Sequence, residues 1–371
     1  MDHFEFRFFS YPFCFRSKMM LEVRAVKNQD EAEIAFAIAN RSFGAEGVNI
    51  QENQNKKAIW FSEPSYSLNN IIVAMFSERI IGVVRIVPKI VCRNEIQYSV
   101  AGFTSICIDK PFRDKGISVS LMEGAIAITQ ERGFDLAMLV ARKAVDHYYV
   151  QFGFHGISSY EKVAMEAISV SEEEMNFEPA GDGLIPFYSS CYDENYSECF
   201  GAFLRSHAQW KFILHLIFQR KDMEALTILF KGEVIGYCFI QDKKICEIAA
   251  LPKFSLITIL FNLKLLDKIK AADDWLDIPS NHLLVRNCRG RDIRIQRREC
   301  SYGGHMARVL QYKKLAIDYA KRTGKSFDHL SDTNGNISHE NLCRLLGCWT
   351  MNGDFENRNV LPFNLNYMDQ F

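Results

Sequence analysis

A short hairpin pattern occurs twice in this chain of 371 residues, and the repeat restricts the folds that the chain can adopt. The segment 76–86, FSERIIGVVRI, matches 230–240, FKGEVIGYCFI, at an offset of 154 residues, with Phe, Ile-Gly and Ile at equal places. In each copy two apolar runs flank a short polar turn, which is typical of a β-hairpin. A helical pattern precedes each copy, over 30–43 and 196–218. We therefore expect an α/β fold with mixed sheets, duplicated as two tandem halves.

Length and composition indicate a folded protein of several domains. The chain is longer than one ordinary domain, and its 48% hydrophobic and 24% charged residues exclude a disordered or collagen-like chain. The 44 Lys and Arg residues nearly balance the 45 Asp and Glu residues, so no global field holds the chain on nucleic acid or an acidic membrane. We therefore predict no nucleic-acid partner and no membrane partner.

The cysteines and the N-terminal leader bear on localisation. Eleven cysteines are scattered along the chain behind no secretory signal, which favours free thiols in a reducing compartment. Charged residues interrupt the aromatic leader 1–20, so it lacks the apolar core of a signal peptide. No window reaches the ~18 consecutive apolar residues of a membrane-spanning helix. We predict a cytoplasmic protein whose leader is an upstream-start artefact or an added surface segment.

The strongest chemical signal is the strand 102–108, which runs into a basic turn that opens a helix. Backbone N–H groups at a helix N-terminus lack intrahelical partners and attract anions. Gly116 lets the backbone approach a ligand closely, while Arg113 and Lys115 add positive charge. The turn is therefore a candidate cradle for a diphosphate. It lacks the endings typical of a nucleotide P-loop and of a dinucleotide fingerprint, so neither ATP nor NAD is favoured.

A second motif follows at Tyr149, which stands four residues before the Gly of a Gly-Phe pair. Arg113, Gly116 and Ser118 match the pattern Arg/Gln-x-x-Gly-x-Gly/Ala, with Ser as a small departure at the last position. Because both motifs occur in order on the expected elements, residues 21–164 resemble the GCN5-related N-acetyltransferase (GNAT) superfamily. The wider layout resembles the enhanced intracellular survival (Eis) type, which joins a GNAT domain to a degenerate second half and a small sterol-carrier-like domain.

The resemblance and the composition together predict five segments. They are an aromatic leader at 1–20, a catalytic GNAT domain at 21–170, a linker at 171–183, a degenerate second GNAT-like half at 184–304 and a small C-terminal sterol-carrier-like α/β domain at 305–371. The last segment is short for a complete third domain. Because 246–256 contains no Arg-x-x-Gly, we do not expect the second half to bind a second CoA.

The resemblance implies an acetyl-CoA-dependent N-acyltransferase, in which a primary amine attacks the thioester directly. Tyr149 aligns with the tyrosine that acts as general acid toward the departing thiolate. The acceptor implied is a polyamine-like or aminoglycoside amine or a protein lysine, and the protein is expected to form homo-oligomers. The residues implied to bind acetyl-CoA belong to the strand end and the turn: Ile106, Cys107, Ile108, Arg113, Asp114, Lys115, Gly116, Ile117 and Ser118.

The general base is predicted less directly. In Eis-like proteins the terminal carboxylate can reach the active site, and this chain ends in an aromatic segment at Phe371 that could dock there. His147, Asp146 and a water chain are the alternatives.

Other functions and sites were weighed against this one. A catalytically inactive acyl-CoA-binding regulatory module with the same fold stays open. The arginine-rich segment 286–298 could bind nucleic acid, but a solvated strand face or subunit contact is favoured. Ile337 replaces the Gly that a calcium loop at 332 would need, and no Cys and His spacing fits zinc, so we predict no metal. Cys107 has no adjacent base and is expected to be a buried hydrophobe.

Overall fold

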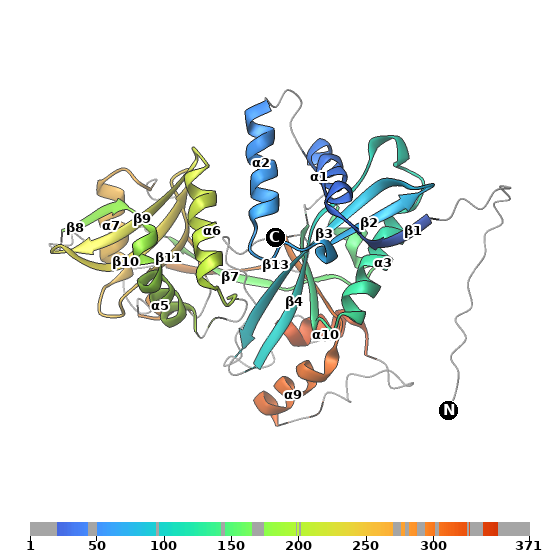
Figure 1. Cartoon of the computed structure of the whole chain (residues 1–371). Coiled ribbons are helices and arrows are strands. Elements are labelled where there is room, and N and C mark those ends of the chain that lie inside the picture. The colour runs from blue at the N-terminus through green and yellow to red at the C-terminus, as the bar shows by residue number, and fades with distance from the viewer. Residues whose placement is uncertain are drawn as a thin grey trace.

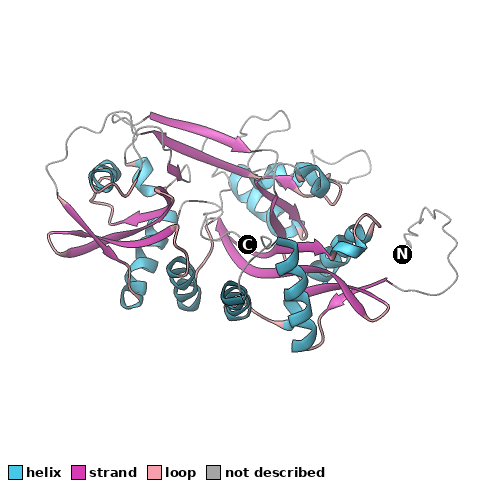
Figure 2. Ribbon diagram, turned by 90° about the horizontal axis from the view of Figure 1, so that it is seen from above, coloured by secondary structure: helices cyan, strands magenta, loops and turns pink. Residues whose placement is uncertain are grey.

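The computed structural model describes residues 21–43, 50–93, 96–141, 145–164, 174–197, 199, 202–269, 276–278, 282–287, 294–300, 304–324, 326 and 337–347. Within these ranges the strands form a seven-stranded, a four-stranded and a three-stranded sheet. Helices lie beside the strands in both larger units (Figures 1 and 2). The α/β class with mixed sheets is therefore confirmed.

The first sheet has the order β1-β2-β3-β4-β5-β14-β6. Its strands are β1 (Leu21–Ala25), β2 (Ile71–Phe76), β3 (Arg79–Arg93), β4 (Ile96–Ile108), β5 (Leu136–Ala141), β14 (Gly304–Val309) and β6 (His155–Gly156). Only β4 and β5 run parallel among these neighbouring pairs of described strands.

Helices cover both faces of the first sheet, so its strands are apolar on both sides. On β2, Ile72 and Ala74 join the core under α3 (Ile117–Glu131). Ile71 and Val73 join the core under α1 (Gln29–Phe43), beside which lies α2 (Ile50–Ser62). The continuous apolar run at 71–76 thus reflects burial of both faces, and η1 (Leu68–Asn70) leads into it.

The parallel pair β4–β5 is paired over only part of its length. Register partners run from Val100↔Leu136 to Phe103↔Leu139, and β4 continues to Ile108 beyond this point. Against β3, a bulge places Ser105 and Ile106 opposite the single residue Val84. Ser105 has a φ of +54°, a left-handed conformation that bends the strand away from its neighbour. The two central strands therefore diverge after Phe103.

The second unit contains a four-stranded antiparallel sheet in the order β11-β10-β9-β8. It is composed of β8 (Met175–Pro179), β9 (Met223–Phe230), β10 (Glu233–Gln241) and β11 (Lys244–Ala250), with η3 (Asp182–Leu184) and the helices α5 (Ile185–Tyr196), α6 (His207–Phe218) and α7 (Leu256–Leu265). The same sequence of strand, two helices, three strands and a helix describes β1 to α3 in the first unit.

The repeated hairpins share a detailed backbone feature. β2–β3 carries an extra residue at Ile81, and β9–β10 carries one at Ile235, each just before the shared glycine. The carbonyl of Ile81 accepts the N–H of Asp109, and that of Ile235 accepts the N–H of Leu251, both at 2.8 Å. In each unit this bond ties the hairpin to the residue that directly follows the next strand, which is β4 in the first unit and β11 in the second.

The helix expected over 196–218 corresponds to the single helix α6, which starts later than expected. α5 ends at Tyr196, and α6 begins at His207. The later start has a local cause, because Ser206 accepts the N–H of Gln209 and the Gln209 side chain bonds back to the Ser206 N–H, forming a capping box.

A three-stranded sheet connects distant segments in the order β12-β7-β13. Its strands are β12 (Leu276–Ile278), β7 (Ser158–Ala164) and β13 (Arg294–Cys300), and α8 (Leu283–Arg286) lies between β12 and β13 in sequence. β13 pairs with β7 from Arg294↔Ala164 to Cys300↔Ser158. The arginine-rich segment thus contributes a strand, as its alternating pattern predicts.

The described residues after 304 differ from the expected separate C-terminal domain. β14 is inserted in the first sheet between β5 and β6, and α9 (Tyr312–Thr323) and α10 (His339–Gly347) pack beside it. The reason is apolarity on both faces of β14: Met306 enters the core under α3, whereas Ala307 and Val309 enter the opposite core. None of the described helices combines the length and apolar character needed to cross a lipid bilayer.

Candidate active site

A cavity of about 740 Å³ opens where β4 and β5 diverge. Its walls are the end of β4, the turn before α3, the first turn of α3 and α4 (Asp146–Val150). Nearly all of the predicted site residues in the described part of the chain line it: Ile106, Cys107, Ile108, Arg113, Asp114, Gly116, Ile117, Ser118 and Tyr149. Lys115 is not among the lining residues, and its ammonium group lies over the ring of Phe112, 5.5 Å from the centroid.

The turn before α3 leaves backbone donors free at the cavity. Gly116 adopts a φ of +73° as the N-cap of α3, and no side chain caps the first turn of this helix. A Cβ on Gly116 would meet no atom within 4 Å, so the glycine is required by its backbone conformation rather than by crowding. Uncapped N–H groups at the positive end of a helix form a site for phosphate oxygens.

The corresponding turn of the second unit is closed. Ser255 is the N-cap of α7, and its side chain accepts the N–H of Ile257 at 3.2 Å. This contrast supports the expectation that the second unit holds no second phosphate cradle.

The cradle is fastened to the sheet by charged side chains. Asp109, which is nearly buried, forms ion pairs with Arg41 at 3.1 Å and Arg79 at 3.3 Å. Its carboxylate also accepts the N–H of Lys110 at the start of η2 (Lys110–Phe112). Arg113 donates from Nε to the carbonyl of Ile108 at 3.0 Å. The turn is therefore pre-formed between α1, the β2–β3 hairpin and β4.

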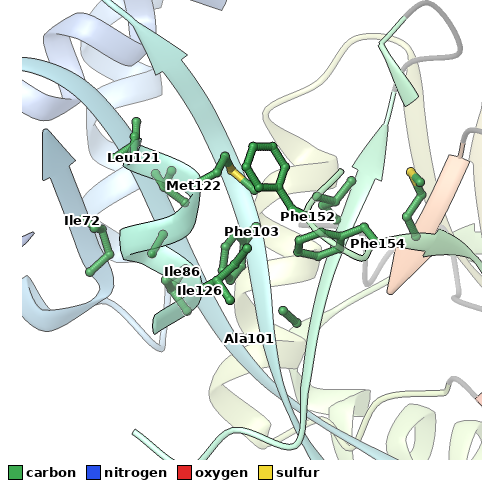
Figure 3. Close-up of a cluster of buried hydrophobic side chains, with 14 of the residues drawn as sticks. Ile72, Ile86, Ala101, Phe103, Leu121, Met122, Ile126, Phe152 and Phe154 are labelled. Atoms are coloured by element: carbon green, nitrogen blue, oxygen red, sulfur yellow. The ribbon is translucent and has the colours of Figure 1, made fainter. Parts of the chain in front are cut away.

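Tyr149 lies close to the point where the central strands diverge. Its ring contacts that of Phe154 at a centroid distance of 6.4 Å, and Phe154 contacts Phe103, the last paired residue of β4, at 5.8 Å. Figure 3 shows Phe154 and Phe103 in one buried cluster, and Phe103 also lines the cavity. Burial raises the pKa of Tyr149, with a smaller contribution from Tyr148. Tyr149 therefore carries its proton at neutral pH.

Tyr148, which was not among the predicted site residues, also lines the cavity. Its ring lies against Tyr149 and Phe152, each at 5.2 Å. Burial raises the pKa of Tyr148, and the nearby Ser118 side chain opposes this rise only in part, because the buried Tyr148 hydroxyl has no hydrogen-bond partner among the described residues. Tyr148 therefore faces the start of α3, whereas Tyr149 faces the divergence of the strands. The one feature of the sequence that could have predicted Tyr148 as a site residue is its position next to Tyr149.

The candidate bases differ in where they lie. His147 is an exposed lining residue of the cavity. Asp146 is on the same helix, and its side chain is outside the description. Phe371 lies outside the described residues.

Cys107 lines the cavity as a thiol. Burial raises its pKa to about 11, which outweighs the lowering by a hydrogen bond with Ser42. A thiol is a poor nucleophile until it is ionised, so this environment agrees with the expected packing role. Among the described residues, no three His, Cys, Asp or Glu side chains gather as a metal site would require.

Three further residues that line the cavity could not be predicted from the sequence, because they come from separate elements. Phe43 at the end of α1, Val140 on β5 and Val145 before α4 are 56%, 41% and 43% exposed and border the cavity. Exposed apolar residues are common, and no sequence spacing groups these three.

Comparisons with known proteins agree with this geometry. Residues 22–157 match the family model "Acetyltransferase (GNAT) domain". A comparison with curated proteins gave no significant match.

Three solved structures are similar in fold, each at 14% identity and covering 80% of this chain. They are a GCN5-related N-acetyltransferase from Anabaena variabilis (TM-score 0.59, 74% of that chain), a probable N-acyltransferase from Enterococcus faecalis (0.58, 74%) and Eis1 from Mycobacterium abscessus (0.55, 75%). The matched segment contains the diverging strands, the uncapped helix and the tyrosine helix. Residues 22–157 are thus a GNAT acetyltransferase domain, and the fold of the chain resembles that of Eis proteins.

Proposed function

We propose that this protein is an N-acyltransferase that moves an acetyl group from acetyl-CoA to a primary amine. One observation carries the proposal: the uncapped N-terminus of α3, the unpaired end of β4 and Tyr149 all open into the same cavity. In acetyl-CoA, the diphosphate would bind the helix N-terminus, the extended amide-containing arm would bind the unpaired strand end, and the thioester would lie near Tyr149.

The described residues fit the donor molecule at both ends. The N–H groups at Gly116, Ile117 and Ser118 would hold the pyrophosphate, with Arg113 adding charge. Backbone groups of β4 around Ile106 lie beyond the last residue that pairs with β5, Phe103, and are available to an amide-containing chain. A pre-formed cradle avoids the ordering that a flexible loop would need on binding.

Tyr149 is the general acid in this proposal. The acceptor amine attacks the thioester carbon, the C–S bond breaks, and the phenol of Tyr149 donates its proton to the departing thiolate. The raised pKa keeps this proton in place across the neutral range. One water or base then takes the proton that the amine loses. The Phe371 carboxylate, His147 and Asp146 remain the candidates for that base.

The lining favours an acceptor whose amine is attached to apolar carbon. Among the described lining residues, Asp114 supplies the one carboxylate, and it belongs to the phosphate turn. Phe43, Val140 and Val145 supply exposed apolar surface instead. A polycation would find few counter-charges there, so an alkyl or aromatic monoamine, or a lysine flanked by apolar residues, fits this part of the site better.

The domain organisation is part of the same proposal. Residues 21–170 form the catalytic GNAT unit, and the degenerate copy, expected over 184–304, already begins at β8 (Met175–Pro179) inside the expected linker 171–183. The shared bulge and the shared hydrogen bond at Ile81 and Ile235 support this duplication. Cytoplasmic location and homo-oligomer assembly are retained from the sequence analysis as predictions.

Thiol release tests the function. The protein is incubated with acetyl-CoA and a panel of amines, and acetylated products are identified by mass. Thiol release that depends on an amine supports the transferase. Saturable acetyl-CoA binding without release across the panel would favour the inactive regulatory module, and no binding would contradict both.

A further inference from the structure

Two residues from the end of the described chain hold the turn that follows Tyr149. Arg308 on β14 donates a hydrogen bond from Nη1 to the carbonyl oxygen of Phe152 at 2.5 Å. These two residues are separated by 156 positions in sequence. β14 is placed for this contact because it pairs with β6, which directly follows the turn.

His339 at the start of α10 contacts the same turn. A Cβ built on Gly153 would lie 2.6 Å from Cδ2 and 2.7 Å from Cγ of His339, so the imidazole ring packs against the glycine backbone. Gly153 also has a φ of +75°, which side chains rarely adopt. Gly153 is thus required for two reasons. Its backbone conformation is left-handed, and a side chain at this position would collide with the imidazole ring of His339.

The tyrosine helix depends on such outside contacts. α4 contains five residues, Asp146–Val150, and helices of this length are not stable alone. The carbonyl of Tyr149 accepts N–H groups from Phe152 and Phe154, which closes the turn. A cation at the C-terminal end of a helix is favourable, and Arg308 supplies one at the next free carbonyl.

The contacts of Arg308 and His339 with the turn after Tyr149, here called the brace, lie outside the cavity. Neither Arg308 nor His339 lines the cavity. α10 is in turn fixed to β14 by Cys343, whose Sγ donates to the carbonyl of Ala307 at 3.0 Å. The described C-terminal elements reach the site by two routes: β14 pairs with β5, whose Val140 lines the cavity, and Arg308 and His339 contact the α4–β6 turn.

We propose that Arg308 and His339 are positioning residues, which hold Tyr149 at the angle needed to protonate the leaving thiolate. This inference rests on the proposed acetyl transfer. It places part of the catalytic machinery in a segment outside residues 22–157, which carry the family match. Donor binding, which relies on the α3 turn, should not depend on this brace.

The test compares Arg308→Met with Lys314→Met in the full chain. Lys314 on α9 also joins the C-terminal segment to the first sheet, through a 2.7 Å ion pair with Asp135, but it does not contact α4. Each variant removes one cation and keeps a long side chain. Arg308→Lys restores the charge, and His339→Ala removes the ring should Arg308→Met fail to fold.

Three quantities are measured for each variant: kcat for thiol release, the Kd for acetyl-CoA, and hydrogen exchange of the amides at 152–154. Loss of a charged hydrogen bond predicts a fall of about 10–100-fold in kcat for Arg308→Met, with Kd changed by less than about twofold. Exchange at 152–154 should quicken, Arg308→Lys should recover part of kcat, and Lys314→Met should leave all three values close to wild type.

Either of two results would overturn the inference. In the first, Arg308→Met and Lys314→Met lower kcat equally; in the second, exchange at 152–154 is unchanged in both Arg308→Met and His339→Ala. Failure of the proposed function has a separate signature, because wild-type protein would then release no thiol. In that case the exchange data alone decide whether Arg308 and His339 hold the tyrosine turn.

Discussion

The guanidinium of Arg113 is bonded to the carbonyl of Ile108, with Nε 3.0 Å from the oxygen. This bond joins the end of the central strand to the turn that opens α3. Arg113 therefore has two uses, because Nε fixes the turn while the rest of the guanidinium remains at the cavity wall. The positive end of the helix and the unpaired strand are held in one fixed relation before any ligand arrives.

Replacing Arg113 with Met should weaken acetyl-CoA binding by about 1–3 kcal/mol, since a charge-assisted contact to phosphate and the bond to Ile108 are both lost. Lys115→Met is the matched control, because Lys115 lies over Phe112 and is not among the lining residues. Calorimetric titration of both variants measures the difference. Equal losses would mean that general positive charge, rather than the placed guanidinium, binds the donor.

Replacing Tyr149 with Phe should lower kcat by about 10²–10⁴-fold, the usual contribution of a general acid, with little change in acetyl-CoA affinity. Tyr148→Phe removes a hydroxyl from the neighbouring position, which faces Ser118 rather than the diverging strands, and should cost less than about tenfold. Single-turnover thiol release separates the two. A larger loss for Tyr148→Phe would transfer the acid role to that residue.

The apolar wall predicts which amines react best. An arylalkyl or alkyl monoamine should have a higher kcat/KM than a polyamine of similar length, because Phe43, Val140 and Val145 offer apolar contact. Val140→Asp adds a carboxylate at this wall and should shift the preference toward the polyamine. A wild-type preference for the polyamine would place its acidic contacts outside the described lining.

Stability should fall as the pH drops below about 6.5, partly because of His282. In the fold its Nε2 lies 2.9 Å from the carbonyl of Ile248 and its Nδ1 accepts the N–H of Leu284 at 3.2 Å, so the buried ring is neutral. Burial lowers the pKa of His282 to about 3. The unfolded chain therefore binds one more proton between about pH 6 and 4, and each pH unit removes about 1.4 kcal/mol of stability.

Urea unfolding at several pH values checks this slope. The partly buried His305, whose pKa is lowered to about 4 by desolvation, adds in the same direction. The variant His282→Asn removes one titrating group and should reduce the slope between pH 6 and 5 by about 1.4 kcal/mol per pH unit. An identical slope in the variant would show that His282 is not neutral and buried in the fold.

Local patterns in the sequence predicted the parts of the fold that local chemistry determines. The hairpins at 76–86 and 230–240 are present, and the basic turn at 113–116 opens α3 at Ile117 as expected. Even the basic segment at 294–300 is a strand, because its alternating pattern is a property of neighbouring residues.

The sequence could not predict contacts between distant segments. Nothing near residue 308 indicates that β14 inserts beside β5 or that Arg308 caps the tyrosine turn. Strand pairing over such a separation depends on the whole core, so the boundary expected at 305 had no local signal against it. By contrast, the predicted start of the helix before the second hairpin was wrong although a local signal was present. Ser206 and Gln209 form a capping box, which is recognisable in the sequence and marks the true start of α6.

The most direct test of the account combines titration and turnover in one sample. Wild-type and Tyr149→Phe proteins are titrated with acetyl-CoA by calorimetry, and an amine acceptor is then added while free thiol is followed. We expect both proteins to bind acetyl-CoA with similar affinity and only the wild type to release thiol rapidly. Equal thiol release by the two proteins, or no acetyl-CoA binding by either, would contradict the account.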